Sequence, residues 1–219
     1  MARFDPARRL GHKAAMASTQ TFFGTDIYRA PLGGRGASAL LADLARAIRQ
    51  LAVDDTAGRR WCAENAYRGY TSYASLDDLA WRDGAFADLE KRLDAHVAAF
   101  ARTLGFELGG RRLKRDSLWV NLLKPGGHHA AHIHPGSVVS GTLYVDVPRG
   151  ASAIKYEDPR LPMMMAAPAP KAAAPLARQR FVSLAPKAGD VLLWESWLRH
   201  EVTINAARTD RLSVSFNYR

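Results

Sequence analysis

The hydrophobic positions in the front half of the chain follow a helical period. Apolar residues there recur at steps of three and four, which is the spacing of one helix face. They form two sets: Leu40, Leu44, Ile48 and Leu51, and then Phe86, Leu89, Leu93, Val97, Phe100 and Leu104. Ser38 is a candidate N-cap for the first set, and Gly105 is a natural stop after the second. The pattern predicts two helices within residues 37–105.

From residue 115 onward the pattern changes to short apolar runs separated by glycine and proline. These runs are rich in β-branched and aromatic residues, as strands are. One similar run lies earlier, over residues 20–32. The later runs cover residues 117–123, 128–134, 138–147, 152–157, 179–185, 190–195, 200–204 and 211–218. So many short strands predict a β-sandwich or barrel in the back half, and therefore an α+β fold for the chain.

The length of 219 residues suits a single domain. We expect residues 1–19 to form a flexible basic arm and residues 20–219 to form one domain, with a helical front over 37–105 and a β-rich core over 115–219. No apolar run approaches the ~18 residues that a membrane-spanning helix needs, so the sequence predicts no membrane span.

The cysteine content and the net charge do not select one class of function. The single cysteine, Cys62, has no partner for an internal disulfide, which favours a cytoplasmic protein with a packed structural thiol. The formal net charge of +10 raises the question of nucleic-acid binding. The basic residues are scattered, however, and no nucleic-acid module accompanies them. A solvated basic surface is the favoured interpretation, with an acidic partner as the alternative.

Histidines in the β-rich half carry the first chemical signal. Residues two apart on a strand point to the same face, so His132 and His134 would converge while Ile133 turns into the opposite packing layer. Imidazole nitrogens suit iron, zinc, copper and nickel. His200, which follows the strand over 190–195, is the candidate third ligand. These three histidines predict a transition-metal site.

An arginine near the C-terminus carries the second signal. Arg211 follows His200 by eleven residues. If His200 and Arg211 lie on the two strands of an antiparallel hairpin, Arg211 returns to the neighbourhood of the metal. Its guanidinium can then bind a carboxylate through two charge-assisted hydrogen bonds, and Ser213 can add a third. The spacing predicts a site for a dicarboxylate beside the metal.

The order of these motifs resembles that of the 2-oxoglutarate/iron(II) oxygenases with a double-stranded β-helix (jelly-roll) core, and in particular a bacterial branch of them. The order is His-x-His, a distal His and then Arg-x-Ser. The blocks that carry the resemblance span roughly half the chain: Asn121–Gly126, His132–Pro135, Ser140–Tyr144, Gly189–Trp194, Ser196–His200 and Arg211–Asn217.

The resemblance implies a fold, an activity and a set of site residues. The fold would be a jelly-roll core with the N-terminal helices packed against it. The chain would be a dioxygenase that hydroxylates an unidentified small molecule or protein and releases succinate and carbon dioxide. Iron(II) would be held by His132, His134 and His200, with no catalytic residue beyond these ligands. The resemblance implies Arg211 and Ser213 for the distal carboxylate of the cosubstrate 2-oxoglutarate. Asn121, on the strand before the histidine pair, and Tyr144, which has the parity of Ser140 and Thr142, are further candidates to line the cosubstrate, with ordinary sheet packing as the alternative for both.

One position departs from the pattern of the superfamily. His134 stands where these enzymes usually carry Asp or Glu, so the site would be about one charge more positive. Occupancy by zinc or nickel therefore stays open. Asp146, Glu157 and Asp158 are the candidate substitute carboxylates, each less favoured than His134.

Two other classes of function stay open at this stage. A cupin-type metalloenzyme that uses no 2-oxoglutarate would explain the histidines but leaves Arg211 and Ser213 unexplained. A non-enzymatic metal- or ligand-binding protein would show no cosubstrate turnover. Pairing into a homodimer is an expectation from the size of such proteins.

Several neighbouring positions receive weaker expectations. His128 has the parity of His132 and is expected either beside the metal ligands or at the mouth of the site, whereas His129 is expected to point away. Trp194 and Trp197 are assigned to the core. The segment 162–175, rich in Pro and Ala, is either a flap over the site or a plain insertion.

Overall fold

A computed structural model describes residues 17–219, in which four helices precede most of the strands. The helices are α1 Ala37–Asp54, α2 Thr56–Glu64, α3 Leu79–Arg82 and α4 Gly84–Thr103. The strands are β1 Tyr28–Pro31, β2 Gly69–Thr71, β3 Arg115–Leu123, β4 His129–His132, β5 Val139–Asp146, β6 Ile154–Glu157, β7 Phe181–Leu184, β8 Asp190–Glu195, β9 His200–Val202 and β10 Arg211–Tyr218.

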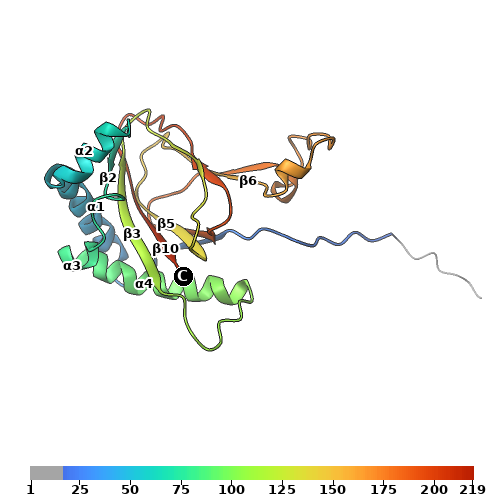
Figure 1. The fold of residues 1–219 in the computed structure, drawn as a ribbon, viewed down its shortest axis with the longest axis horizontal. Helices are drawn as coiled ribbons and strands as arrows, with labels where there is room; N and C mark the ends of the chain where they lie inside the picture. Colours follow the sequence, from blue (N-terminus) through green and yellow to red (C-terminus); the bar gives the residue numbers. More distant parts are fainter. Residues whose placement is uncertain (1–16) are drawn as a thin grey trace, which may run out of the picture.

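The strands form two antiparallel sheets. The larger has the order β1-β8-β5-β10-β3-β2, and the smaller has the order β4-β9-β6-β7. The helices cover one face of the larger sheet, and the smaller sheet lies over its other face (Figure 1). The expectation of an α+β fold with a jelly-roll core and helices packed against it is confirmed.

Strand alternation divides the larger sheet into an apolar face and a polar face. On β3, Leu118, Val120 and Leu122 join the main core with the helices. The alternate residues of the same strand, such as Ser117 and Asn121, point toward the smaller sheet, since successive side chains of a strand face opposite sides. The large core therefore lies under the helices, and a polar surface is left between the two sheets.

The two predicted helices are present as α1 and α4, but the predicted cap is wrong. The N-cap of α1 is Gly36, in the left-handed region with φ 72°, and no side chain caps the helix. Ser38 is the second residue of the helix because the turn made by Gly36 starts it earlier. The stop at Gly105 is confirmed, with φ 67°.

The first predicted strand is largely wrong. Only Tyr28–Pro31 pair with β8, and residues 17–27 have no regular structure. Phe23 lies in the left-handed region with φ 59°, which interrupts an extended strand. The proposed basic arm lies mostly outside the described residues, so the division at residue 19 stays a prediction.

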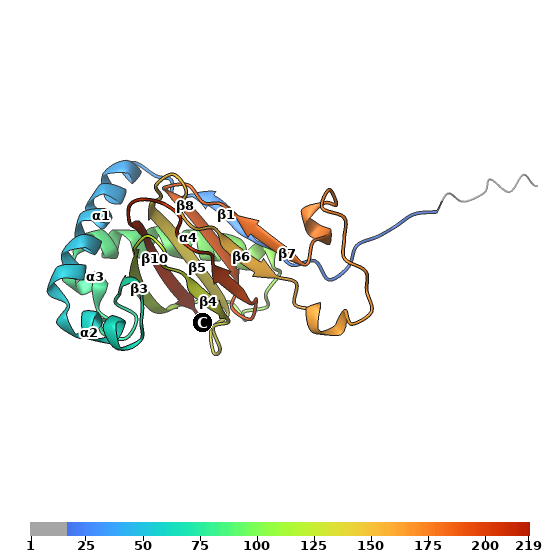
Figure 2. The ribbon, with the colours of Figure 1, turned by 90° about the horizontal axis from the view of Figure 1, so that it is seen from above.

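The segment between β6 and β7 extends away from both sheets (Figure 2). It holds two short 3₁₀ turns, Leu161–Met163 and Leu176–Arg178. None of the described residues in 158–180 lines the cavity between the sheets. This geometry favours the insertion over the flap.

Cys62 is buried in α2, where its Sγ accepts a hydrogen bond from the backbone N–H of Thr71 at 3.3 Å. The expectation of a packed structural thiol is confirmed. Among residues 17–219, no helix combines the length and the apolar character that crossing a membrane requires.

Candidate active site

A cavity of about 1110 Å³ lies between the two sheets. Its floor is the polar face of β3, β10 and β5, whose register sets residues of the three strands side by side in rows. The rows are Ser117–Asn217–Ser140, Trp119–Ser215–Thr142, Asn121–Ser213–Tyr144, and finally Leu123 beside Arg211. Its opposite wall is formed by β4, β6 and β9 of the smaller sheet.

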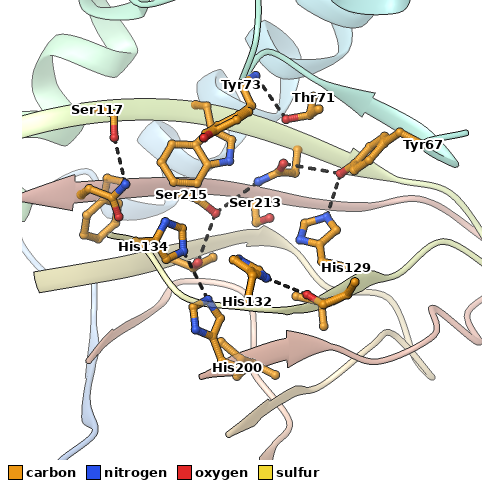
Figure 3. A pocket seen from close by; sticks show the side chains of 18 of the residues that line it. Tyr67, Thr71, Tyr73, Ser117, His129, His132, His134, His200, Ser213 and Ser215 are labelled. Atoms are coloured by element: carbon orange, nitrogen blue, oxygen red, sulfur yellow. Dashed lines mark hydrogen bonds between the residues drawn. The ribbon is translucent and has the colours of Figure 1, made fainter. Parts of the chain in front are cut away.

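The three candidate metal-binding histidines converge at this opposite wall (Figure 3). One ring nitrogen from each of His132, His134 and His200 lies within 4.8 Å of the others. His132 ends β4 and pairs with His200, the first residue of β9. His134 lies just past the strand, where its backbone N–H donates to the Ser196 carbonyl at 3.0 Å. Ile133 is 45 % exposed and lines the cavity mouth, so its predicted place in a packing layer is wrong.

Backbone carbonyls fix which nitrogen of two rings is available to a metal. The Nδ1 of His132 lies 2.7 Å from the Ala130 carbonyl, and that of His200 lies 2.8 Å from the Leu198 carbonyl. A carbonyl can only accept, so Nδ1 carries the proton in both rings and Nε2 presents its lone pair. The Nε2 atoms of His134 and His200 are 3.3 Å apart. Two nitrogens bound to one metal at about 2.0–2.1 Å have about this separation.

Burial keeps the rings of His134 and His200 uncharged. It lowers the pKa of His134 to about 4 and that of His200 to about 3. A metal binds only the neutral imidazole, so the rings need to lose no proton at neutral pH. The protonation state of the cluster therefore suits metal binding.

The alternative carboxylates lie elsewhere and are engaged in ion pairs. Asp146 pairs with Arg49 at 2.9 Å, Glu157 with Arg199 at 3.3 Å, and Asp158 with Arg160 at 2.8 Å. None of the three belongs to the cluster of metal-binding groups found among residues 17–219. The geometry favours His134 over these carboxylates as the third candidate ligand.

Arg211 enters the cavity from the floor, not from a hairpin with His200. The predicted hairpin is wrong because β9 pairs with β4 and β6, whereas β10 pairs with β3 and β5 in the other sheet. His200 and Arg211 therefore approach the same cavity from opposite walls. A jelly-roll folds consecutive strands into different sheets, and a spacing of eleven residues cannot distinguish this crossing from a hairpin.

The Arg211 side chain is a buried cation without a counter-ion. It is 1 % exposed, and its Cζ lies 4.8 Å from the centre of the Tyr144 ring. Its Nε and Nη1 atoms have no hydrogen-bond partner in the described part of the chain, and no carboxylate of that part pairs with it. Burying an unpaired charge is costly, so this group needs an anion.

Three further buried donors lie in the small core cluster between the sheets. The hydroxyls of Tyr144 and Tyr156 and the Nε1 of Trp194 have no hydrogen-bond partner within residues 17–219. Tyr156 pairs with His200 across β6 and β9, and the Trp194 ring is 4.7 Å from that of His200. The sequence reasoning missed Tyr156, although its place on a short strand among the histidine blocks was a usable signal. Trp194 is core as expected, whereas Trp197 is 47 % exposed and its core assignment is wrong.

A hydrogen-bond network crosses the floor of the cavity. The Tyr67 hydroxyl lies 2.8 Å from the Nε2 of His129 and donates to the Asn121 Oδ1 at 3.4 Å. The Asn121 amide donates to the Ser215 hydroxyl at 3.2 Å, which in turn contacts the Thr142 hydroxyl at 3.2 Å. The network holds the Asn121 amide in one orientation.

His129 belongs to this network, so the expectation that it points away is wrong. The pairing of β4 with β9 is irregular between His129 and His132, and this irregularity breaks the strand alternation on which the expectation depended. Burial lowers the pKa of His129 to about 3, so its ring is neutral. His128 is exposed and lines the cavity rim, as expected.

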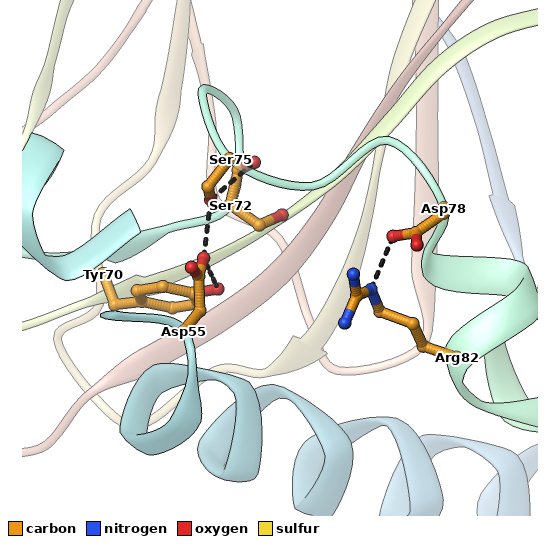
Figure 4. Close-up of polar contacts among 6 residues, drawn as sticks. All are labelled: Asp55, Tyr70, Ser72, Ser75, Asp78 and Arg82. Carbon is orange, nitrogen blue, oxygen red and sulfur yellow. Dashed lines mark hydrogen bonds and ion pairs between the residues drawn. The ribbon is translucent and has the colours of Figure 1, made fainter. Parts of the chain in front are cut away.

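Asp55 anchors β2 and the turn that follows it through Tyr70 and Ser75 (Figure 4). Tyr67 lies just before this strand and Tyr73 just after it. The Asp55 carboxylate accepts hydrogen bonds from the Tyr70 hydroxyl at 2.8 Å and the Ser75 hydroxyl at 2.5 Å. It also accepts from the backbone of Gly58 at 2.9 Å and so caps α2. Burial alone would raise the pKa of Asp55, but these hydrogen bonds outweigh it and lower the pKa. One side chain thus joins α2, β2 and the turn that follows.

The comparison with protein families gives one match. The family described as "Putative 2OG-Fe(II) oxygenase" matches residues 117–217, which begin in β3 and end in β10. No curated protein matches the sequence. The matched range contains the histidine cluster, Asn121, Tyr144, Arg211 and Ser213.

Solved structures support the fold. The non-heme alpha ketoglutarate dependent epimerase SnoN from nogalamycin biosynthesis is similar at 17 % identity and a TM-score of 0.59, over 89 % of this chain and 78 % of that one. A prolyl-4-hydroxylase of Pseudomonas putida is similar at 17 % identity and a TM-score of 0.57, over 89 % and 93 %. HygX of Streptomyces hygroscopicus, with nickel and 2-oxoglutarate bound, is similar at 16 % identity and a TM-score of 0.55, over 89 % and 82 %. With the family match, the conclusion is that the jelly-roll part of this chain, residues 117–217, belongs to the 2-oxoglutarate/Fe(II) oxygenase family.

Proposed function

We propose that this chain is a 2-oxoglutarate- and iron(II)-dependent dioxygenase that hydroxylates a substrate and releases succinate and carbon dioxide. One observation carries the assignment of the site. A buried Arg211 without a counter-ion shares a cavity with three converging imidazoles. A metal alone would bind the histidines and leave Arg211 without a role. An anion that binds both the metal and the Arg211 guanidinium accounts for the histidines and for Arg211.

The residues fit iron(II) as the metal. His132, His134 and His200 would hold it through imidazole nitrogens, which iron(II) accepts, and three ligands leave positions for a chelating cosubstrate and dioxygen. Bound there, iron(II) together with 2-oxoglutarate and dioxygen would supply the oxidising chemistry. The chain itself supplies the orientation of the ligands and a cavity closed on two sides by the sheets.

The floor residues fit 2-oxoglutarate. Arg211 would bind the distal carboxylate, and Ser213, two residues along β10 on the same face, would add a hydroxyl. Asn121 and Tyr144 flank Ser213 in the same row of the sheet and would line the cosubstrate. Each hydrogen bond to a charged group contributes about 1.5–3 kcal/mol, so the pairing also relieves the cost of the buried guanidinium.

The charges in the cavity also favour an anionic cosubstrate. An imidazole ligand contributes no charge, so a divalent metal held by the three histidines would keep both of its charges, and Arg211 adds a third. A dianion compensates two of them. The positive site thus attracts 2-oxoglutarate more strongly than a site with a carboxylate ligand would.

Titration of the anaerobic, iron(II)-loaded protein with 2-oxoglutarate tests the proposal. We expect a saturable visible charge-transfer band of the chelate. Arg211→Ala should weaken 2-oxoglutarate binding at least about 100-fold, since two charge-assisted hydrogen bonds disappear, while iron affinity stays unchanged. Arg208→Ala is the matched control, because Arg208 is exposed in the loop just before β10 and does not line the cavity.

Three other results of this titration would contradict the role of Arg211 or favour another class of function. A band that persists at the same affinity in Arg211→Ala would contradict the role of Arg211. Bound iron without any band would favour a cupin-type metalloenzyme. A protein that binds no iron would be a non-enzymatic binding protein.

The remaining aspects of the function are also proposals. The single cysteine supports a cytoplasmic enzyme. The substrate would be a small molecule or a protein, and the scattered basic residues give no support to nucleic acid as a substrate. A homodimer would accord with the size of the chain.

A further inference from the structure

The cavity has room for a second molecule beside 2-oxoglutarate. Its volume of about 1110 Å³ slightly exceeds the about 300–1,000 Å³ of pockets that hold drug-sized ligands. Arg211 and Asn217 lie at its opposite ends, six residues apart on one face of β10. At about 3.4 Å per residue this separation is about 20 Å along the strand, which a five-carbon dicarboxylate cannot span. The end at Asn217 is therefore free for another ligand.

Two aromatic rings form a corner at this free end. The rings of Tyr73 and Trp119 are 5.3 Å apart with an interplanar angle of 71°. Trp119 is 9 % exposed, whereas Tyr73 is 62 % exposed and lies at the mouth. The Trp119 ring is also 5.8 Å from that of His134, so a group packed in this aromatic corner lies next to the histidine cluster (Figure 3).

The floor below the corner offers neutral hydrogen-bonding groups. The Asn217 amide donates to the Ser117 hydroxyl at 3.0 Å and accepts from the Ser140 hydroxyl at 2.8 Å. Within the described chain, the Ser117 hydroxyl donates to no protein group and stays available to a ligand. Charged side chains at this end are limited, among the described lining residues, to Asp116, which is paired with Arg219 at 2.9 Å.

We propose that the Tyr73–Trp119 corner and the Ser117–Asn217 floor form the site of the oxidised substrate, which presents an uncharged ring with a hydroxyl or amide substituent. The proposal rests on the proposed function, because it takes the histidine cluster as the oxidising centre. A ring places one face on Trp119 and its edge on Tyr73, since the two rings meet nearly at a right angle. Its polar substituent reaches the floor.

The charge of the site selects against ionised substrates. A carboxylate has no free cation at this end and would instead compete for Arg211. An ammonium group would meet the uncompensated charge of the metal, and Asp116 is already paired. A flexible acyclic chain would lose rotamer freedom that a ring has already given up.

Saturation-transfer NMR on the full-length, metal-free protein tests this with three matched probes. Cyclohexanecarboxamide is the uncharged ring, cyclohexanecarboxylate is the same ring with a charge, and hexanamide has the amide without the ring. In the metal-free protein we expect the carboxamide to bind about tenfold more tightly than hexanamide, a difference of about 1.4 kcal/mol. The comparison with the carboxylate is made with zinc(II) and 2-oxoglutarate present, so that Arg211 is already occupied, and there the carboxamide should again bind about tenfold more tightly.

Substitutions locate the binding. Tyr73→Ala and Trp119→Ala should each weaken binding of the carboxamide about tenfold. Tyr73 is mostly exposed, so its replacement tests the site even if Trp119→Ala fails to fold. Trp81→Ala is the control, because Trp81 is 85 % exposed on α3 and does not line the cavity.

Equal binding of the three probes, or unchanged binding in Tyr73→Ala, would overturn the proposal, and so would displacement of the carboxamide by 2-oxoglutarate. The signal of 2-oxoglutarate in the same sample reports the proposed function separately. Loss of that signal with carboxamide binding intact would reject the cosubstrate while leaving the ring site in place.

Discussion

Among single residues, His134 has the largest expected effect on the proposed metal site. It stands where the superfamily usually carries a carboxylate ligand, and its Nε2 lies 3.3 Å from that of His200. As a ligand, its imidazole would supply a nitrogen without a charge, so the proposed site would depend on all three rings for its affinity.

Removal of any one of the three histidines should therefore abolish tight iron binding. Changes to groups around a metal site already cost about 10–100-fold in affinity, so we expect His132→Ala, His134→Ala and His200→Ala to cost at least about 100-fold. Competition with a metal-sensitive dye under anaerobic conditions measures this. His128→Ala, at the exposed rim, should bind iron normally. Full iron affinity in His134→Ala would refute the three-histidine site.

A second residue-scale prediction concerns Tyr67, whose hydroxyl joins His129 to Asn121. Tyr67→Phe removes this link and frees the Asn121 amide to rotate. We expect affinity for 2-oxoglutarate to fall about fivefold, the equivalent of one hydrogen bond of about 1 kcal/mol, with iron affinity unchanged. The charge-transfer titration reads both quantities. Tyr28→Phe, which alters a hydrogen bond to His96 outside the cavity, is the control, and an equal loss in both variants would contradict a specific role.

At the scale of elements, the site depends on segments that have little regular structure of their own. Tyr67 and Tyr73 flank β2, which has three residues, and β2 is held by β3 on one side and by Asp55 on the other. A single half-buried carboxylate therefore anchors the strand that lies between both tyrosines.

Asp55→Ala should destabilise the fold by about 2–4 kcal/mol, because it removes a helix cap and leaves the Tyr70 and Ser75 hydroxyls without their acceptor. Urea unfolding followed by circular dichroism measures the change. Asp78→Asn, which breaks only the exposed pair with Arg82, should leave stability nearly unchanged. A similar midpoint for Asp55→Ala and the parent protein would show that the anchor is dispensable.

At the scale of the whole molecule, folding is coupled to the protonation of buried histidines. His129, His134 and His200 have pKa values of about 3, 4 and 3 in the folded state, against about 6.5 when unfolded. A lowered pKa contributes stability that is present above the unfolded value and is lost as pH falls through the window down to the folded value. Acid therefore favours the unfolded chain, which binds more protons.

The metal-free protein should accordingly lose stability between pH 6.5 and pH 5, by roughly 1–2 kcal/mol for each of these histidines. Urea unfolding at several pH values gives the dependence of the free energy of unfolding on pH. In His200→Gln this dependence should be weaker by the contribution of one histidine. A free energy of unfolding that stays constant or increases as the pH falls from 6.5 to 5 would contradict neutral rings in the folded state.

Local patterns in the sequence were enough to predict the division into a helical front and a β-rich back, the three histidines that converge in the cavity, and Arg211 as the candidate residue for a carboxylate. These follow from local periodicity and from the donor atoms of the side chains. β8 and β10 match the predicted strands to the residue, since turns with glycine or charged residues delimit them.

How these residues meet follows from the arrangement of the two sheets in space. The crossing of consecutive strands into opposite sheets brings Arg211 to the histidines from the other wall, and the irregular pairing of β4 turns His129 inward. The aromatic corner combines Tyr73 from a loop with Trp119 from a strand. Such contacts join residues far apart in the chain, so they depend on sheet order and register, which local hydrophobic patterns do not encode.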